Sequence, residues 1–376
     1  MERFSTVIVG GGIVGCAVAH YLAEEGESDV LVVEAEELGS GSTGGSFGGV
    51  RQQFSTALEI ELSRRGLEFW RTAERRFDSP VPWHPNGYLF MTGQPDIMAK
   101  LAEAAALQRT MGLTEIHILD PEQIREVVPW IATPGLLGGT YTPNDGKVTP
   151  TDGVAALVKA ARKRGVGFRE HWAVRSLEKE PTGWRVIGPE VLMAKRVVVC
   201  TGYWATDFLR SFGLELTIRP QALYSAITGP ALAGRPLPLT IDLDTGFLVE
   251  REAEGLIIAI LFEDNPPGYG HTQMLEDFAE LARVRAPSLA DLHIAKRVVA
   301  NVDMGGDGHP YVGSVEDGLW MAAGLGGHGV MHGPPVGELL AKTIAGRPDP
   351  ALDMAPLSPW RKAGTGSEWM VAAKKG

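Results

Sequence analysis

The sequence predicts an α/β fold in which two domains alternate along the chain, one built on a parallel sheet and one on a mainly antiparallel β-sheet with helices. A glycine-rich turn, GGGIVGC at residues 10–16, stands between an apolar stretch and a helix-like stretch. Two more apolar runs, at residues 197–200 and 319–323, repeat the buried-strand pattern late in the chain. The long segments between them contain strand-like stretches, which indicates a second sheet.

The length and composition indicate a globular protein with more than one domain. The chain has 376 residues, more than one compact core usually holds. Its 35 Lys and Arg against 46 Asp and Glu give a net charge of −11, which argues against nucleic acid or anionic lipid as the main partner. No apolar run approaches a membrane span, and residues 7–19 lack a signal-peptide cleavage site. Cys16 and Cys200 have no metal or CxxC spacing, so we expect free thiols and a cytoplasmic protein.

The first elements carry the most informative motif. Residues 6–9 have the pattern of a buried strand, and residues 13–25 that of a helix. The motif G-x-G-x-x-G lies between them at Gly10, Gly12 and Gly15. In that motif the first glycine makes a tight turn, the second lets a pyrophosphate approach the backbone, and the third lets helix and strand pack closely. The unpaired N–H groups at the helix start then face the phosphates, so we predict a Rossmann-type domain that holds a dinucleotide.

The second strand and the loop after it extend this site. Residues 30–33 form an apolar run that ends at Glu34, where a carboxylate can accept hydrogen bonds from an adenosine ribose. The following loop, EAEELGSGSTGGSFGGVRQQFS, is rich in small residues and hydroxyls. Such a loop can wrap an extended dinucleotide through Ser42 and Thr43. A nicotinamide dehydrogenase would instead continue at once into alternating strands and helices.

The rest of the chain alternates between the two kinds of sheet. Thr56-x-x-Glu59 has the pattern of a capping box at the start of a long helix. Pro334 and Pro335 are expected in the first turn of the last helix, where proline is tolerated. The other predicted elements are a strand at 87–92, helices at 96–111 and 152–163, a hairpin at 183–188, a strand at 197–200, strand-like segments at 217–228 and 246–261, a helix at 272–284, a strand at 319–323 and a helix at 333–344.

These motifs, in this order and spacing, resemble a known family. They are the three glycines with Glu34, the loop GSGST to GGVRQQFS, and the stretches NDGKVTP, VVVCTG, DGHPYVG and GLGGHGVMHGPPVG. The set is similar to the FAD-dependent amino acid and amine oxidoreductases of the D-amino-acid oxidase superfamily. Within that superfamily it resembles the branch of sarcosine oxidase, dimethylglycine dehydrogenase, glycine oxidase and dye-linked proline dehydrogenase. The resemblance implies an FAD held between the two domains and hydride transfer from the carbon next to a substrate nitrogen to flavin N5.

The alternation of the two kinds of sheet also implies a division of the chain into two domains. The FAD-binding domain is expected from residues 1–80, 146–215 and 300–360, and the substrate-binding domain from residues 81–145 and 216–299. Residues 361–376 are expected to form a loose tail.

Carried onto this sequence, the family's cofactor contacts fall on the glycine turn, the loop after Glu34, the end of the strand at 197–200 and the loop before the last helix. That last loop leads into a helix start, whose N–H groups would stabilise the negative charge of a reduced flavin by up to ~2 kcal/mol. The cofactor-binding residues so expected are Gly10, Gly12, Ile13, Val14, Gly15, Glu34, Ala35, Ser42, Thr43, Gly48, Gly49, Val50, Val174, Thr201, Gly202, Trp204, Gly324, Gly326, Gly327, His328, Gly329, Val330 and Met331.

Departures from the family matter as well. Some relatives attach the flavin covalently through a histidine or a cysteine, at places where this chain has Gly44-Gly45 and Ala300. We therefore expect a dissociable, non-covalent FAD. In sarcosine oxidases a lysine after G-H-G-x grips the substrate carboxylate, and Met331 stands there in this chain. The lysine that activates oxygen in that branch has no obvious match either. The electron acceptor therefore stays open between oxygen, a quinone and a partner protein.

Candidate catalytic and substrate residues follow from the same motifs. Arg51 and His328 are the expected catalytic residues, Arg51 because arginine matches anionic groups bidentately. His328 and His332 have metal-like spacing but no evident third ligand, so we expect no metal site. The residues expected to contact substrate are Gln53, Tyr88, Arg219, Tyr224, Phe247 and Arg251.

The favoured activity is oxidation of the C–N bond of a small amino acid or of a secondary or N-methyl amine. Two alternatives stay open. One is an FAD-dependent 2-hydroxy acid or glycerol phosphate dehydrogenase, because these enzymes share the fold. The other is a flavoprotein of low turnover that serves as a subunit or an assembly factor.

Overall fold

The first of the two large sheets has eight strands, and its central strands are parallel. The structure is a computed structural model that describes residues 1–235, 237–362 and 368–371. Its strand order is β17-β18-β11-β1-β2-β8, and the pairs from β18 to β8 are parallel. An antiparallel hairpin of β9 and β10 extends β11, and β17 pairs antiparallel with β18. The strands are β1 (Arg3–Val9), β2 (Val30–Val33), β8 (Gly167–Arg169), β9 (Ser176–Glu180), β10 (Gly183–Ile187), β11 (Val191–Val199), β17 (Tyr311–Glu316) and β18 (Leu319–Ala323).

Both faces are covered at the centre of this sheet, which explains why residues 7–9, 30–33, 197–199 and 319–323 are unbroken apolar runs. Ile8 and Val198 point into one buried cluster, while Val7, Val9 and Val199 point into another on the opposite face. Four helices cover the first face, with α8 packed against α1 and α2, and α5 packed against the same two helices. They are α1 (Ile13–Glu24), α2 (Ala57–Phe77), α5 (Pro150–Arg162) and α8 (Gly329–Ile344). The short helix α6 (Ala205–Leu209) lies on the other face, with Ala205 and Leu209 in its cluster.

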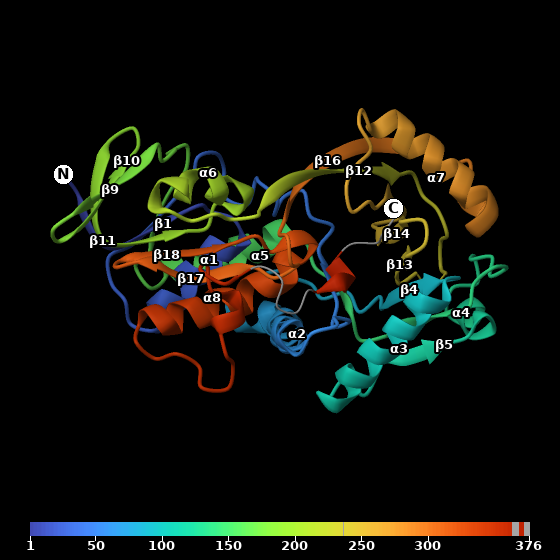
Figure 1. Cartoon of the computed structure of the whole chain (residues 1–376). Coiled ribbons are helices and arrows are strands. Elements are labelled where there is room, and N and C mark those ends of the chain that lie inside the picture. The colour runs from blue at the N-terminus through green and yellow to red at the C-terminus, as the bar shows by residue number, and fades with distance from the viewer. Residues whose placement is uncertain (236, 363–367, 372–376) are drawn as a thin grey trace.

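The second sheet also has eight strands, in the order β16-β12-β15-β14-β13-β4-β6-β5. Its pairs are antiparallel except for β4 with β13. In Figure 1 the long strands β12 and β16 run side by side from the part of the molecule that carries α6 toward α7. The strands are β4 (Tyr88–Thr92), β5 (His117–Leu119), β6 (Gly138–Thr142), β12 (Arg219–Thr228), β13 (Leu239–Asp242), β14 (Phe247–Glu252), β15 (Gly255–Ile260) and β16 (Ile294–Met304).

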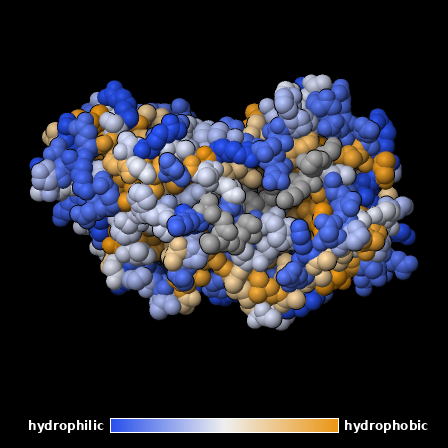
Figure 2. Space-filling model, in the orientation of Figure 1, coloured by the Kyte–Doolittle hydropathy of each residue, from blue (hydrophilic) through white to orange (hydrophobic). Residues whose placement is uncertain are grey.

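Helices flank this second sheet, and they are α3 (Pro95–Thr110), α4 (Pro121–Val127) and α7 (His271–Arg285). Met274, Phe278 and Ala282 of α7 pack into the cluster on one face of the sheet. The opposite face carries a separate cluster that includes Tyr88 and Phe90. Hydrophilic residues cover much of the surface in Figure 2, with hydrophobic residues scattered among them. Within the described ranges, no helix combines the length and apolar character needed to cross a membrane.

The predicted α/β fold class is confirmed. The first sheet takes its strands from residues 3–33, 167–199 and 311–323, and the second takes its strands from residues 88–142 and 219–304. The sheets thus follow the alternation that the motifs predict. The domain boundaries themselves remain a prediction.

The last helix differs from its predicted form. Helix α8 begins at Gly329 rather than Gly333, so Pro334 and Pro335 lie in its second turn. Proline has no N–H to donate to the carbonyl four residues earlier, which frees the oxygens of Val330 and Met331. Trp70 of α2 donates its indole N–H to the Val330 oxygen at 3.0 Å. The helix therefore tolerates the proline pair because a side chain from a neighbouring helix replaces a missing backbone donor.

The prediction of a loose tail is wrong for the tail residues that the structure describes near Arg361 and Glu368. Arg361 forms a buried ion pair with Asp307, with Nε 2.8 Å from Oδ2. Glu368 and Met370 are almost fully buried. Residues 363–367 and 372–376 of the predicted tail lie outside the described residues.

A buried ion pair joins α7 to the second sheet. Arg285 Nε donates to Asp242 Oδ2 at 2.9 Å, and burial raises the pKa of Asp242 although Arg285 opposes that shift. We expect Arg285→Leu to reduce the free energy of unfolding by about 3–5 kcal/mol, because it leaves the Asp242 carboxylate buried without a cationic partner. Arg210→Leu is the control, since the Arg210–Asp207 pair is exposed and its loss should cost less than about 1 kcal/mol. Urea unfolding of both variants tests this, and equal losses would contradict it.

Candidate cofactor and substrate site

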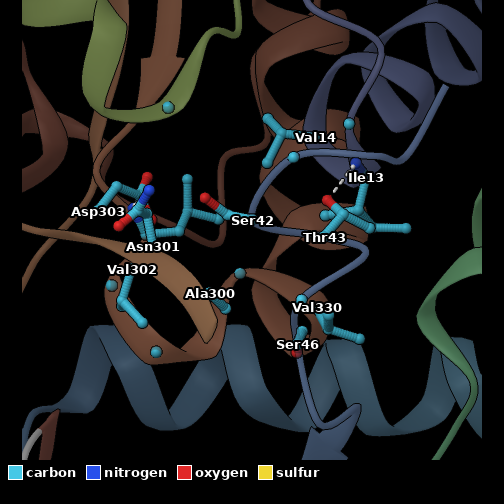
Figure 3. Close-up of a pocket in the computed structure, with 18 of the residues that line it drawn as sticks. Ile13, Val14, Ser42, Thr43, Ser46, Ala300, Asn301, Val302, Asp303 and Val330 are labelled. Atoms are coloured by element: carbon cyan, nitrogen blue, oxygen red, sulfur yellow. Dashed lines mark hydrogen bonds between the residues drawn. The ribbon is translucent and has the colours of Figure 1, made fainter. Parts of the chain in front are cut away.

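One cavity of about 840 Å³ extends from the glycine turn of the first sheet to the strands of the second. The first α1 residues, the loop after β2, the end of β11, β16 and the loop before α8 all line it. Figure 3 shows Ile13 and Val14 of α1, Ser42 and Thr43 of the loop, and residues of β16 around this space. The cavity therefore lies at the carboxyl ends of β1 and β11, the usual place for a ligand in an open parallel sheet.

The three glycines of the turn have distinct steric environments. Gly10 has φ +107°, and a Cβ on it would lie 2.4 Å from the Cys200 oxygen. A Cβ on Gly15 would lie 2.0 Å from the Gly10 oxygen. Gly12 lines the cavity, and a Cβ on it would have the Thr43 hydroxyl as its nearest neighbour, at 3.2 Å. Gly10 and Gly15 thus permit close packing, while Gly12 keeps the cavity open at the start of α1.

Glu34 is held at the other side of the turn by backbone donors. Its Oε2 accepts the Gly11 N–H at 2.6 Å, and its Oε1 accepts the Glu36 N–H at 3.0 Å. Ala35 and Val174 line the cavity beside it. This end is polar and shaped by backbone groups, as an adenosine ribose requires.

The loop before α8 forms the opposite wall. The Asp303 carboxylate accepts the N–H groups of Gly324 and Leu325 at 3.0 and 3.2 Å, which fixes the turn into that loop. Burial raises the pKa of Asp303 to about 6, although those two donors oppose the shift. Gly326 and Gly327 line the cavity. Their backbone and the start of α8 therefore face the bound ligand.

Most of the predicted cofactor residues meet in this cavity. Gly15, Gly48, Val50, Gly324 and His328 do not line it. A Cβ on Gly48 would lie 1.9 Å from the Val148 oxygen, and Val50 is fully buried. Those that do line it are Gly10, Gly12, Ile13, Val14, Glu34, Ala35, Ser42, Thr43, Gly49, Val174, Thr201, Gly202, Trp204, Gly326, Gly327, Gly329, Val330 and Met331.

His328 does not line the cavity, so the structure does not support a direct catalytic role for its side chain, and that role stays a prediction. The imidazole is 1% exposed and packs edge-on against Phe54, with ring centroids 5.2 Å apart. Burial lowers its pKa well below the ordinary value, so the ring is neutral. Among the described residues neither of its ring nitrogens has a hydrogen-bond partner.

Behind the α8 start lies a buried cluster centred on Glu59. Its Oε1 is 2.7 Å from His309 Nδ1, and its Oε2 is 3.0 Å from His332 Nδ1. His332 Nε2 in turn contacts Ser63 Oγ at 2.6 Å. Burial alone would raise the pKa of Glu59, but His332 and His309 outweigh it and hold that pKa below its ordinary value. The cluster joins α2, the DGHPYVG turn and α8 through one ionised carboxylate.

This cluster corrects two predictions. Glu59 does supply a third ligand atom near His328 and His332, and the three atoms lie within 4.8 Å of one another. The capping box is also incomplete. The Thr56 hydroxyl accepts the Glu59 N–H at 3.4 Å, but the Glu59 side chain turns inward to the histidines. Glu368 takes its place and accepts the Thr56 N–H at 3.0 Å.

Arg51 lines the cavity as a buried cation. Its side chain donates to the carbonyls of Gln53 and Met370, and its guanidinium lies 3.9 Å from the centre of the Phe54 ring. No carboxylate among residues 1–235, 237–362 and 368–371 forms an ion pair with it. Burial lowers the pKa of Arg51. An anionic ligand group in the cavity would relieve this unpaired charge.

The NDGKVTP motif positions Arg51, a role that the sequence did not reveal. Strand β3 (Gly49–Val50) pairs with β7 (Gly146–Lys147), one residue before Arg51. Asp145, fully buried, accepts the Gln52 N–H at 3.1 Å on the other side. Burial raises the pKa of Asp145 to about 7, against the opposing hydrogen bonds from Gln52.

Of the six predicted substrate residues, Tyr88 alone lines the cavity. Gln53 is buried beside it and donates to the Tyr88 carbonyl at 3.0 Å. Phe247 stacks on Phe278 on the far face of the second sheet, with centroids 4.6 Å apart. Tyr224 packs edge-on against His271.

The two arginines predicted to contact substrate do not line the cavity. Arg219 is about half exposed and pairs with Asp264 at 2.5 Å. Arg251 donates to the carbonyls of Ala231 and Leu232. The cavity wall is instead made by side chains that the prediction missed, from alternate positions of β4 and β13 and from residues near β12, β14 and β15. They are Phe90, Gln221, Leu239, Ile241, Leu243, Leu248, Leu261 and Asn265, together with Met370 from the tail.

The glycine turn, the acid after β2 and the cavity shared with a second sheet define a dinucleotide-binding α/β protein. More closely, the chain belongs to the FAD dependent oxidoreductase family, whose model matches residues 5–343. The resemblance stated from the motifs is therefore confirmed.

The alignments with individual relatives cover nearly the whole of this chain. It is 28% identical to the mitochondrial dimethylglycine dehydrogenase of Rattus norvegicus, an alignment that covers 96% of this chain and 45% of that protein. It is 24% identical to the glycine oxidase of Bacillus licheniformis, with 92% and 94% covered. The solved L-proline dehydrogenase from P. horikoshii has a TM-score of 0.88 and 26% identity, with 96% and 98% covered. The chain thus spans less than half the length of the first of these relatives.

Replacing Glu59 tests the buried cluster. We expect Glu59→Gln to lower the free energy of unfolding by about 3–5 kcal/mol, because His309 and His332 lose their anionic partner. Glu68→Gln, on the exposed face of the same helix, should change it by less than about 0.5 kcal/mol.

The pH dependence gives a second measure of the same cluster. A carboxylate whose folded pKa is held low stabilises the protein where the unfolded carboxylate is ionised. The advantage of the wild type over Glu59→Gln should therefore be complete above about pH 4.5 and shrink as the pH falls below it. Denaturant unfolding at several pH values measures this, and a pH-independent difference would contradict it.

Proposed function

We propose that the protein oxidises the C–N bond of a small amino acid or of an N-methyl or secondary amine that carries a carboxylate. The observation that carries this proposal is Arg51, a buried cation without an ion-pair partner among the described residues, in the wall of the cavity. Around it the second sheet supplies apolar walls from Tyr88, Phe90 and Leu239. One cation in an apolar cleft suits a ligand with one carboxylate and a small body.

The residues present fit the family's cofactor. Gly12 leaves open space at the α1 N-terminus, where the diphosphate of FAD would be held. Glu34 would bind the ribose, and the Gly326–Gly327 backbone would line the flavin ring. When bound, FAD supplies a hydride acceptor at N5.

The chain's own residues then bind, orient and desolvate the substrate. Arg51 binds the carboxylate, because its guanidinium retains donors beyond the two that Gln53 and Met370 occupy. The apolar walls favour the neutral amine over the ammonium, since a charge without a partner is costly there. Holding that neutral amine in one orientation contributes to the rate without an active-site base.

The place of action and the electron acceptor are part of the same proposal. Cys16 and Cys200 are buried, free thiols, which supports a reducing compartment such as the cytoplasm. Oxygen, a quinone or a partner protein would take the electrons, and oxygen uptake measured against dye reduction separates these acceptors.

We further propose that FAD binds without a covalent bond. Gly45 and Ala300 lie in contact in the cavity wall, and neither has a side chain that bonds to a flavin. Cys200 also lines the cavity, which the sequence did not predict, but burial raises the pKa of its thiol to about 12. A neutral thiol is a poor nucleophile. Acid precipitation of the yellow protein should leave the flavin in the supernatant, and a yellow pellet would refute this.

Anaerobic titration tests the reaction. We expect N-methyl amino acids or amino acids to bleach the flavin, whereas the matching 2-hydroxy acids and glycerol phosphate should not. Bleaching by a hydroxy acid alone would favour the alternative dehydrogenase, and no bleaching by any compound would favour the low-turnover subunit.

The role of Arg51 has its own test. Arg51→Met should lower kcat/KM for the active amino acid about 10- to 100-fold, because a charge-assisted hydrogen bond contributes about 1.5–3 kcal/mol. The control is Arg219→Met, whose side chain lies outside the cavity and whose loss should change kcat/KM less than about twofold. Equal effects of the two substitutions would contradict the role of Arg51.

A further inference from the structure

Within the described part of the C-terminal tail, the segment Glu368–Met370 reaches the cavity through Met370. Met370 is 5% exposed and lines the cavity. Its side chain belongs to the same apolar cluster as Tyr88, Phe90 and Leu239. Its carbonyl accepts a hydrogen bond from Arg51 Nη2 at 2.5 Å, a contact between residues 319 positions apart in the sequence. The tail thus meets both the apolar wall and the cation of the site.

Glu368 anchors this segment. Its Oε2 accepts the N–H groups of Ser55 and Thr56 at 2.8 and 3.0 Å, and its Oε1 accepts the Ser55 hydroxyl at 2.6 Å. The side chain is almost fully buried, so these bonds are shielded from water. Thr56 is the N-cap of α2, where the helix dipole favours a negative charge. A carboxylate bonded in this way holds the tail at a fixed place relative to the loop that carries Arg51.

A second bond reinforces the turn of the tail itself. The Met370 N–H donates to Glu368 Oε1 at 2.9 Å, and the Glu368 N–H donates to the Asp307 carbonyl at 3.0 Å. Met370 is therefore tied through its own N–H, through its carbonyl and by apolar packing. Its side chain is a constrained part of the cavity wall.

We propose that Met370 limits the length of the substrate chain that the cavity accepts, and that Glu368 and the Met370 carbonyl position the Arg51 guanidinium for the substrate carboxylate. This inference rests on the proposed function, because it assigns a carboxylate to Arg51. Replacing methionine by alanine removes three heavy atoms from the wall next to that cation. A longer apolar ligand can occupy the vacated volume, and one methylene in such a pocket changes affinity about 10-fold or more.

The test uses the full-length, FAD-loaded protein and straight-chain carboxylates from acetate to hexanoate, with perturbation of the flavin spectrum as the readout. This measurement requires no turnover. In Met370→Ala the preferred chain should be two or three carbons longer than in the wild type, with a gain of at least about 10-fold for that ligand. The matched variant Met370→Leu should keep the wild-type preference for chain length, because leucine has a volume similar to that of methionine. An unchanged preference in a folded, flavin-loaded Met370→Ala protein would overturn the proposal, as would a wild type that binds none of the carboxylates.

Glu368→Gln tests the anchor. It should weaken binding of every carboxylate in the series about 10-fold without changing the preferred length, and FAD affinity should stay within twofold. The control is Glu276→Gln, on the exposed face of α7. A loss of FAD equal to the loss of carboxylate affinity would assign Glu368 a general structural role and overturn its positioning role. If the carboxylate profile shifts as expected while no amine bleaches the flavin, the tail inference stands and the proposed reaction fails.

Discussion

The close approach of three backbone segments at Gly10 is the constraint on which the site depends. The turn after β1 lies against the Cys200 oxygen at the end of β11, and the Gly15 turn of α1 lies against the Gly10 oxygen. No side chain fits at either contact. This packing brings the N-terminus of α1 to the edge of the sheet. The loop after β2, the end of β11 and the loop before α8 line the cavity together with it. The loop with Thr43 is tied to the same place, since its hydroxyl accepts the Ile13 N–H at 3.1 Å.

The first sheet was predictable because its signals are local. Its central strands are buried on both faces, so residues 7–9, 30–33 and 197–199 are continuous apolar runs, and the glycine motif and Glu34 lie next to two of them in sequence. The existence of the second sheet was predictable, but the face of that sheet that lines the cavity was not. Both faces of its central strands are buried in separate clusters, so alternation does not reveal which face meets the cavity. The sequence pattern therefore points to Phe247, which lies in the cluster on the other face, and does not single out Leu239 and Ile241, which line the cavity.

Long-range contacts account for the other errors. Glu59 has the sequence pattern of a capping residue, yet two histidines from residues 309 and 332 draw its carboxylate inward. Glu368 then serves the helix start from more than 300 residues away. No local rule anticipates such an exchange, because either carboxylate satisfies the N-cap equally well. The same holds for Met370, whose place at Arg51 depends on the folded path of the whole chain.

The proline pair of α8 has a mechanical consequence. Trp70 completes the hydrogen bonding of the Val330 carbonyl, and Gly66 leaves room for the Met331 carbonyl that the second proline frees. These two contacts fix the position of α2 along α8. A shift of one helix along the other would leave the Val330 carbonyl buried without a hydrogen-bond donor. The fixed pair thereby supports the start of α8, where Gly329, Val330 and Met331 line the cavity.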